Sequence, residues 1–307
     1  MLEIEARREI YSFYEEIYKF YERNYIMKTA VVDVGGGLRG VYAAGVLDTC
    51  LDDQIHFDLA IGVSAGSGNI LSYIAGQRGR NYKYYLEYSR RPDYMGLDQL
   101  VKEGSLINLD YIYGSLNEEE GGEPLDYEKV LSSQIEWYVV ATEADTGEVR
   151  FFDRNDLKKD DYSILAASSA VPLACNPYPV GDEYFVDGGV ANPVPVEDAF
   201  RFGADRVVLI LTKPEDLVRQ SLADINIAAM LSLRYPKIAE LMVTRAERYN
   251  QAVAYAQELS QKGKVLIISP DDTEGVRMIT FNSESLQRLY ERGLRDGKEI
   301  RSFMQNA

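Results

Sequence analysis

The sequence predicts an α/β fold of three layers, in which helices cover both sides of a mostly parallel central sheet. Short runs rich in β-branched and apolar residues alternate with longer segments of helical periodicity, a pattern typical of buried parallel strands and the helices between them. A glycine-rich loop follows the first of these runs, and a Gly-Val-Ser-Ala-Gly turn follows the second. The core therefore begins in the order strand, glycine loop, helix, strand, tight turn, helix.

The composition is that of a globular protein. The chain has 307 residues, of which 46% are apolar and 27% charged, which is enough for one large α/β domain with additions or for two small domains. The formal net charge of −16 argues against binding of nucleic acid and against electrostatic docking on anionic lipid headgroups. Charge excludes neither lipid substrates nor a transient contact with a membrane surface, and the oligomeric state stays open.

Cysteine content and the N-terminus bear on the compartment. Cys50 and Cys175 are the two cysteines, and in a chain of this length they suggest buried thiols in a reducing compartment rather than a disulfide framework. The N-terminus lacks an apolar signal core, and no stretch of about 18 apolar residues occurs. We therefore expect a cytoplasmic protein.

The first residues are expected to stand apart from the core. Apolar side chains recur near the helical period over residues 2–25, with charges between them, so we expect one helix there. We interpret residues 1–26 as an N-terminal helical extension and residues 27–307 as the main domain.

The remaining elements are expected in the following order. Strands are predicted over residues 29–34, 57–63, 136–142, 149–153, 178–180, 184–187, 206–212 and 264–269. Turns through Asp145-Thr146-Gly147 and Gly181-Asp182 predict two hairpins. Helices are predicted over residues 41–53, 65–75, 163–169, 222–260 and 284–304. Residues 80–130 are rich in tyrosine and interrupted by glycine, so we expect short helices and loops that form a cap.

The second strand leads into a candidate nucleophile. Gly62-Val63-Ser64-Ala65-Gly66 matches the G-x-S-x-G elbow, in which a serine lies on a sharp turn between strand and helix. A serine hydroxyl needs a base to take its proton. The single histidine, His56, precedes Ser64 by eight residues, and a strand between them at about 3.3 Å per residue separates the two by about 20 to 25 Å. The base is then a carboxylate, a lysine or another group, or Ser64 is not catalytic.

The glycine loop has two interpretations. Gly35-x-Gly37-x-x-Gly40 between a strand and a helix satisfies the dinucleotide-binding fingerprint. That site needs an acidic residue at the end of the second strand, where this sequence has Gly62-Val63-Ser64. The same geometry also makes an oxyanion hole from backbone N–H groups. We favour the oxyanion hole, because the elbow emerges from the neighbouring strand.

Asp187 is the candidate base. It ends a strand-like run and precedes Gly188-Gly189, which places a carboxylate at a strand end beside a tight turn. The pattern alone is more typical of a simple Asp-Gly turn than of a catalytic site.

Together these motifs resemble those of the bacterial patatin-like phospholipases. That family has a G-G-G-x-[RK]-G loop, a G-x-S-x-G elbow and a D-G-[GA] motif, and this chain has all three in the same order. Ser168-Ser169-Ala170-Val171-Pro172 is similar to the family's small-residue stretch before the aspartate. The resemblance spans residues 30–195. It implies a patatin-like α/β/α domain with a cap-like insert at about 80–130 and a less specific C-terminal part at about 215–307.

The resemblance implies a Ser64-Asp187 dyad that works without histidine, metal or cofactor. The oxyanion loop would consist of Gly35, Gly36, Gly37 and Arg39, with the amide of Ala65 as a further donor. The remaining motif glycines are Gly40, Gly62, Gly66, Gly188 and Gly189. Two roles for Arg39 stay open, one toward a substrate phosphate and the other in a salt bridge that holds the loop.

The expected function is hydrolysis of lipid carboxylic esters, of the phospholipid or lysophospholipid type by resemblance. A general esterase, a thioesterase or an acyltransferase would use the same acyl-enzyme. A non-catalytic or nucleotide-binding protein on this fold is the alternative of another class. The tyrosines of the insert suit an acyl-chain pocket, a lipid interface or simple packing of the cap: Tyr82, Tyr84, Tyr85, Tyr88, Tyr94, Tyr111 and Tyr113.

Overall fold

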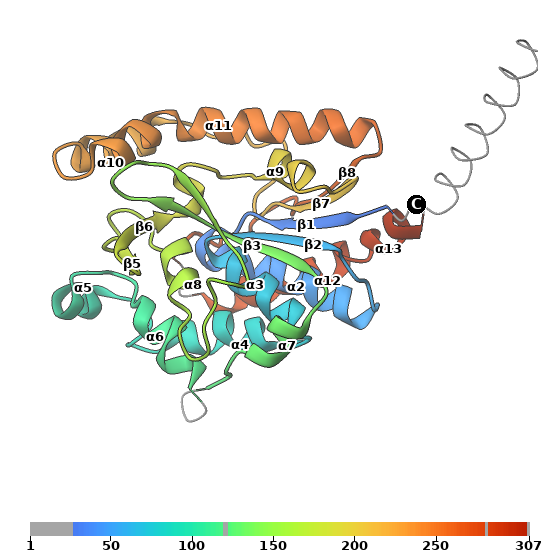
Figure 1. The fold of residues 1–307 in the computed structure, drawn as a ribbon, viewed down its shortest axis with the longest axis horizontal. Coiled ribbons are helices and arrows are strands. Elements are labelled where there is room, and N and C mark those ends of the chain that lie inside the picture. The colour runs from blue at the N-terminus through green and yellow to red at the C-terminus, as the bar shows by residue number, and fades with distance from the viewer. Residues whose placement is uncertain (1–26, 119–121, 280–281, 306–307) are drawn as a thin grey trace, which may run out of the picture.

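The computed structural model describes residues 27–118, 122–279 and 282–305 (Figure 1). The helix expected over residues 2–25 lies outside the described residues. Eight strands of the described chain form one sheet in the hydrogen-bonded order β5-β6-β3-β2-β1-β7-β8, with β4 paired to β3. The strands are β1 (Thr29–Asp33), β2 (Leu59–Val63), β3 (Glu136–Glu143), β4 (Val149–Phe152), β5 (Tyr178–Val180), β6 (Glu183–Asp187), β7 (Arg206–Ile210) and β8 (Val265–Ile268).

The middle of the sheet is parallel, as the apolar runs predicted. Strands β3, β2, β1, β7 and β8 run parallel to one another. Strands β4 and β6 run antiparallel to β3, and β5 runs antiparallel to β6. The pairs β3–β4 and β5–β6 are the two hairpins expected from their turn residues.

Helices cover both faces of the sheet, which confirms the three layers (Figure 1). Val31 of β1 packs in a cluster with α2 (Val41–Asp52), α3 (Ala65–Ile74) and α12 (Ser283–Asp296). Its neighbours Ala30 and Val32 pack in a cluster with α9 (Val196–Arg201) and α11 (Pro236–Gln261). This alternation follows from the period of two in a strand. The other helices outside the insert are α8 (Ser163–Ser168), α10 (Leu222–Leu231) and α13 (Glu299–Gln305).

Each of the two long C-terminal helical segments is divided in two. The segment expected over residues 222–260 consists of α10 and α11, which begins with Pro236 in its first turn. Proline lacks an amide proton and is tolerated in a first turn but not inside a helix, so α10 ends before it. The segment expected over residues 284–304 consists of α12 and α13, separated at Gly297.

The tyrosine-rich insert forms a cap of short helices beside α3 (Figure 1). These are α4 (Arg80–Leu86), η2 (Tyr88–Arg90), α5 (Leu97–Glu103), α6 (Leu109–Tyr113), η3 (Ser115–Asn117) and α7 (Tyr127–Ser132). Buried Arg80 ties the cap to the core: it donates to Ser72 Oγ of α3 at 2.9 Å and to Asn117 Oδ1 at 2.7 Å. The cap is therefore fixed against the helix that follows the Gly62–Gly66 turn.

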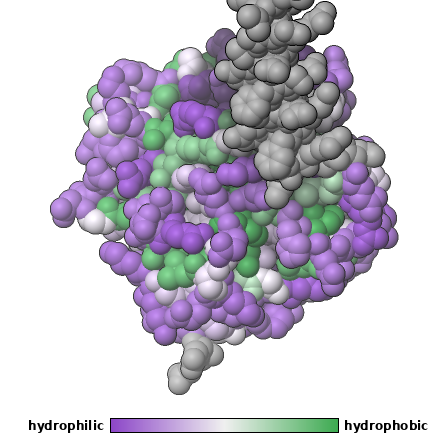
Figure 2. Space-filling model, turned by 45° about the vertical axis from the view of Figure 1, so that its right-hand side comes forward, coloured by the Kyte–Doolittle hydropathy of each residue, from purple (hydrophilic) through white to green (hydrophobic). Residues whose placement is uncertain are grey.

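The surface combines polar and apolar regions. Figure 2 shows that polar side chains cover most of the face in view, with apolar patches between them. Among the helices in the described ranges, none has both the length and the apolar character needed to cross a bilayer.

Candidate active site

Strands β2 and β6 meet end to end along one edge of β3. Val63 of parallel β2 pairs with Val140, and Asp187 of antiparallel β6 pairs with the next residue, Ala141. Strand β4 pairs with β3 across this junction. Because one edge of a strand bonds one partner at each residue, β4 takes one edge and β2 and β6 share the other. The carboxyl ends of β2 and β6 therefore face each other, and Ser64 meets Asp187.

Ser64 lies on a strained turn, as an elbow requires. Its φ of 57° and ψ of −132° are unusual for a residue with a side chain, and it is buried. The Ser64 amide donates to Ser168 Oγ at 2.9 Å, and that hydroxyl donates to the Val140 carbonyl at 2.6 Å. Ser67 donates to the Ser64 carbonyl through both its amide and its hydroxyl. These bonds hold the turn, and the motifs alone identified neither Ser67 nor Ser168 as its support.

Asp187 is buried, lies against the Ser64 hydroxyl and accepts a hydrogen bond from the Gly189 amide at 2.8 Å. Burial raises the pKa of its carboxyl above the usual value, while the charge of Arg245, the Ser64 hydroxyl and the Gly189 amide act against that rise. A carboxylate with a raised pKa is a stronger base than an exposed one. The Asp-Gly turn expected from the pattern is present as well, so Asp187 caps the turn and faces the serine.

The glycine loop packs directly on the elbow. It joins β1 to the short helix η1 (Gly37–Gly40). Gly35 has a φ of +64°, and a Cβ there would lie 2.2 Å from the Val63 carbonyl and 2.9 Å from the Gly66 amide, so no side chain fits. Within the described chain, the amides of Gly36 and Gly37 make no hydrogen bond to another element.

A buried carboxylate supports the loop from below. Asp33 accepts from the Gly35 amide at 2.9 Å and from Asn69 Nδ2 of α3 at 2.8 Å. Burial raises the pKa of Asp33 to about 6, although both hydrogen bonds act in the other direction. Because the Gly35 amide is bonded to Asp33, Gly35 shapes the loop, whereas the amides of Gly36 and Gly37 have no such partner among the described residues.

The remaining motif glycines lie where two parts of the chain approach closely. A Cβ would stand within 2.6 Å of another atom at Gly40 (Tyr85 Oη), Gly62 (Ser67 Cα), Gly66 (Asp33 O) and Gly188 (Val140 O). Gly189 instead contributes its amide to Asp187. The three motifs therefore interlock around Ser64.

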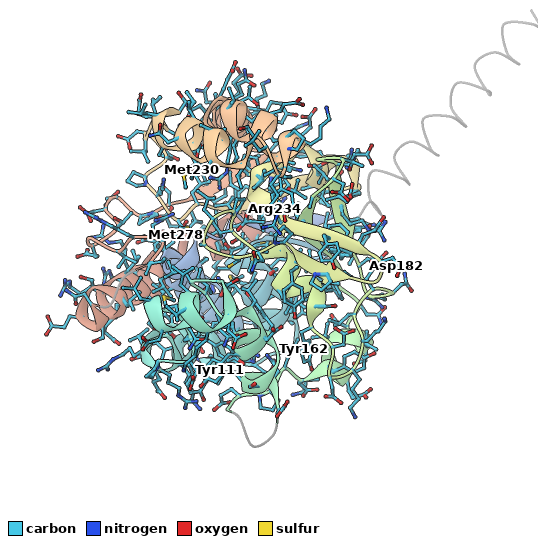
Figure 3. All side chains as sticks on the ribbon, turned by 90° about the vertical axis from the view of Figure 1, so that its left-hand side faces the viewer. Tyr111, Tyr162, Asp182, Met230, Arg234 and Met278 are labelled. Atoms are coloured by element: carbon cyan, nitrogen blue, oxygen red, sulfur yellow. The ribbon has the colours of Figure 1, made fainter. Side chains whose placement is uncertain are left out.

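Two cavities meet at Ser64. The first, of about 80 Å³, extends under the cap and is largely apolar; its lining includes Tyr84, Tyr85, Tyr94, Met95, Ile112 and Tyr113. The second, of about 220 Å³, contains Asp187 and the glycine loop and carries several charged side chains. Gly37, Val171 and Met278 line both cavities. Met278 is labelled in Figure 3, which views the molecule from the side of α10 and the cap. The buried tyrosines thus pack the cap and also line a cavity that reaches Ser64.

Arg39 lies in the second cavity, beside the loop. A Cβ at Gly36 would be 3.3 Å from its guanidinium. In the described part of the chain Arg39 forms no ion pair, and its buried Nε has no hydrogen-bond partner. Burial and the neighbouring Arg219 lower the pKa of Arg39 to about 10. The salt bridge considered for this residue is therefore not found among the described residues.

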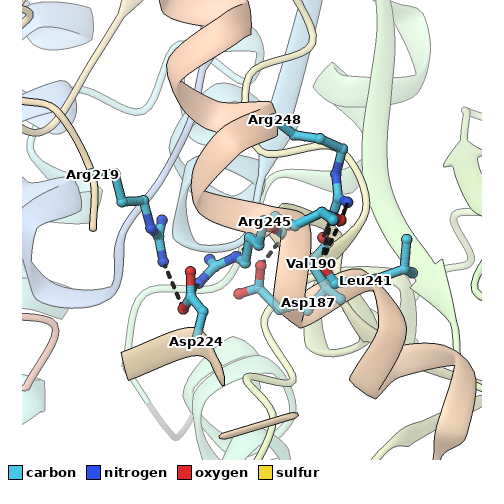
Figure 4. Close-up of polar contacts among 9 residues, drawn as sticks. Asp187, Val190, Arg219, Asp224, Leu241, Arg245 and Arg248 are labelled. Carbon is cyan, nitrogen blue, oxygen red and sulfur yellow. Dashed lines mark hydrogen bonds and ion pairs between the residues drawn. The ribbon is translucent and has the colours of Figure 1, made fainter. Parts of the chain in front are cut away.

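Helix α11 contributes arginines that the motifs did not indicate (Figure 4). Arg245 donates from Nε to the Gly189 carbonyl at 2.6 Å, and Arg248 donates to the Val190 carbonyl at 2.6 Å. Both hold the turn that follows Asp187. A signal existed in the sequence: Arg245 stands three residues after Met242 and four before Tyr249, within the buried stripe of α11.

Other candidate groups lie elsewhere. Exposed His56 precedes β2 and lines a separate cavity with Lys28 and Asp58 at the opposite end of the strand from Ser64, as strand geometry predicted. Both cysteines are free and buried. Among the described residues there is no group of three or more His, Cys, Asp or Glu side chains placed to hold a metal ion.

Comparison with known proteins agrees with these motifs. A family model described as patatin-like phospholipase matches residues 34–200, and a second, described as a domain of unknown function (DUF6363), matches residues 235–305. The uncharacterized protein YjjU of Escherichia coli (strain K12) is 29% identical over 192 residues, which are 62% of this chain and 53% of the relative. The chain thus matches about half the length of that protein.

A similar solved structure is that of VipD from Legionella pneumophila. It has a TM-score of 0.45 and 14% sequence identity, and the match covers 89% of this chain and 66% of that chain. The family model for patatin-like phospholipases covers more than half of the chain and contains all three motifs. The protein belongs to the patatin-like phospholipase family.

Proposed function

We propose that the protein is a serine acyl hydrolase that cleaves carboxylic esters of lipids, of the phospholipid or lysophospholipid type. The observation that carries this proposal is the approach of the Ser64 hydroxyl to the buried Asp187 carboxylate. This approach occurs where β2 and β6 meet, inside a domain of a lipid acyl hydrolase family.

The reaction follows from the two side chains. Asp187 takes the Ser64 proton as Oγ attacks the ester carbonyl, and the proton then passes to the departing alcohol as the carbon–oxygen bond of the ester breaks. Water attacks the acyl-enzyme in the second half, with Asp187 again accepting a proton and returning it to Ser64. The raised pKa of Asp187 favours its role as the base.

Backbone amides are suited to stabilise the tetrahedral oxyanion. The amides of Gly36 and Gly37 lie in the loop on the elbow, and the Ala65 amide lies at the start of α3, where the helix dipole favours negative charge. Such donors stabilise charge that develops only in the transition state, and loss of one costs on the order of 3 kcal/mol in other enzymes.

The apolar cavity is the reason to propose a lipid acyl group as the acid part of the ester. Its lining of tyrosine, methionine and aliphatic side chains offers a non-polar surface that begins at Ser64. General esterase, thioesterase and acyltransferase activities share the acyl-enzyme and differ in the acyl group and the acceptor.

A fluorophosphonate probe tests the nucleophile. Wild-type protein is expected to be labelled at Ser64, and the Ser64→Ala variant is expected to stay unlabelled with an unchanged circular dichroism spectrum. A p-nitrophenyl ester series then tests the acyl pocket, with kcat/KM rising from short to medium or long chains. Absence of labelling in the folded wild-type protein would reject the hydrolase and favour a non-catalytic role.

A further inference from the structure

Four cationic side chains line the cavity that contains Asp187. They are Arg39, Lys213, Arg219 and Arg245, and they face two carboxylates, Asp187 and Asp224. Four cations against two carboxylates leave an excess of two positive charges even when both acids are ionised. The chain as a whole has a net charge of −16, so this local excess is opposite to its overall composition.

Two of these cations are held in place by α10 and α11 (Figure 4). Arg219 and Arg245 share the same oxygen of buried Asp224, at 3.2 and 3.4 Å. Arg219 also stands over the ring of Tyr249, 5.7 Å from its centroid, and its amide donates to Asn250 at 2.9 Å. One carboxylate oxygen thus serves two guanidinium groups, and most of their N–H donors have no partner among the residues that the structure describes.

The other two cations have no anionic partner within the described chain. Neither Arg39 nor Lys213 forms an ion pair there. Burial and the neighbouring arginines lower the pKa of Lys213 to about 8. Like charges held together in a partly desolvated cavity repel one another, and an anion bound among them removes that repulsion.

We propose that this cavity binds the phosphate of a phosphomonoester carried by the alcohol part of the ester, while the acyl chain occupies the apolar cavity. The proposal rests on the proposed hydrolase function of Ser64. The two cavities join at Gly37, Ser64, Val171 and Met278, so one ester can extend into both of them with its carbonyl at Ser64. Arginine side chains suit phosphate because their planar donors bind its oxygens in pairs.

The excess of two positive charges selects among phosphate-bearing lipids. A phosphomonoester near neutral pH approaches two negative charges, which balances the cavity. A zwitterionic headgroup adds an ammonium, which would face the four cations. The expected substrate class is therefore an acylated glycerol phosphate rather than its choline or neutral counterpart.

Kinetics on matched substrates test this selection. With one acyl chain, kcat/KM is measured for the acylglycerol phosphate, the acylglycerophosphocholine and the monoacylglycerol. The phosphomonoester is expected to be preferred over the other two, and Lys213→Gln is expected to reduce that preference about tenfold, the size of one charged hydrogen bond. Lys262→Gln is the matched control, because Lys262 is exposed at the far end of α11. Equal kcat/KM values for the three lipids would overturn the proposal.

A binding measurement tests the cavity without turnover. Inorganic phosphate is titrated calorimetrically into Ser64→Ala protein, alone and with Lys213→Gln, and weaker binding is expected in the double variant. Equal or absent binding in both would overturn the proposal even if Ser64 reacts with the fluorophosphonate and neutral esters are cleaved. Phosphate binding without a preference for the acylglycerol phosphate would assign the cavity to free phosphate and would also overturn it. The two proposals can also fail separately. Phosphate binding that depends on Lys213, together with a wild-type protein that the fluorophosphonate does not label, would retain the phosphate site and reject the hydrolase.

Discussion

The backbone amide of Ser64 donates a hydrogen bond of 2.9 Å to the hydroxyl of Ser168, which comes from the C-terminal turn of α8. The same hydroxyl donates to the Val140 carbonyl of β3 at 2.6 Å. One buried side chain therefore joins the elbow to the strand along which β2 and β6 meet.

Replacing Ser168 by alanine is expected to loosen the elbow. The change leaves a buried amide and a buried carbonyl without their partner, which costs about 1–3 kcal/mol of unfolding free energy. We expect kcat to fall while KM changes little, because the position of Ser64 Oγ is affected rather than substrate contact. Urea denaturation and ester kinetics measure both effects. Ser132→Ala is the control, since the hydrogen bonds of exposed Ser132 within the described residues stay inside α7. The unfolding free energy of this variant should differ from wild type by less than about 0.5 kcal/mol. Equal effects of the two substitutions would contradict this role for Ser168.

Asp187→Asn is expected to reduce turnover by orders of magnitude with the fold retained. Asparagine keeps the shape of the side chain but cannot accept the Ser64 proton, and loss of a general base lowers rates by about 10²–10⁴-fold. Single-turnover kinetics and thermal unfolding measure the two properties. Activity within a few-fold of wild type would show that another group is the base. In the wild-type protein, activity should fall at low pH with a midpoint above 3.8, since burial raises the pKa of this carboxyl.

Gly35 and Gly76 offer a matched pair of substitutions. Both have a positive φ, +64° and +68°, but a Cβ at Gly76 meets no atom within 4 Å, whereas one at Gly35 meets the Val63 carbonyl. Gly76→Ala should cost about 1–2 kcal/mol from backbone strain alone. Gly35→Ala should cost more and should remove activity, because the loop must move away from the elbow. Equal unfolding free energies and unchanged activity in both variants would mean that the close packing of Gly35 on the elbow is not required.

Asp33 should make stability depend on pH. Its pKa is about 6 in the folded protein and 3.8 as the reference for the unfolded chain. Between these values the folded protein holds a proton that unfolding releases, so this contribution is fully present below pH 3.8 and is lost as pH rises through 6. It amounts to at most about 3 kcal/mol. The difference in unfolding free energy between wild type and Asp33→Asn should change by up to this amount from pH 4 to pH 7. Wild type should be more stable relative to the variant at pH 4 than at pH 7. Any effect of the substitution that does not depend on pH cancels in this comparison. If the unfolding free energies of the two proteins change with pH in parallel, the prediction is wrong.

His56→Gln is expected to leave the rate within a few-fold of wild type. His56 is exposed and lies before β2, whereas Ser64 follows the carboxyl end of that strand. Steady-state kinetics on one ester suffice to measure this, with circular dichroism as the folding control. A loss of several orders of magnitude in folded protein would mean that the imidazole reaches the reaction.

The local features of this protein follow from its sequence. The β-branched runs, glycine positions and turn residues predicted the strands and both hairpins, and the G-x-S-x-G pattern predicted the strained turn at Ser64, because these features depend on neighbours along the chain. Pro236 was a local signal for the break between α10 and α11, and the long helical pattern obscured it.

The motifs named Asp187 and the glycine loop as partners of Ser64, but only the tertiary structure shows how the chain brings them together. Asp187 lies 123 positions along the chain from Ser64, at residue 187 against residue 64, and no pattern states that β6 continues the edge that β2 leaves. Ser168, Asp33 and Arg245 likewise reach the site from separate elements. The charge of the second cavity is a sum over side chains from η1, β6, α10, α11 and the segment between β7 and α10. Local propensity depends on a few adjacent residues, whereas this site depends on the register of β3 with three other strands, which only the packing of the whole sheet determines.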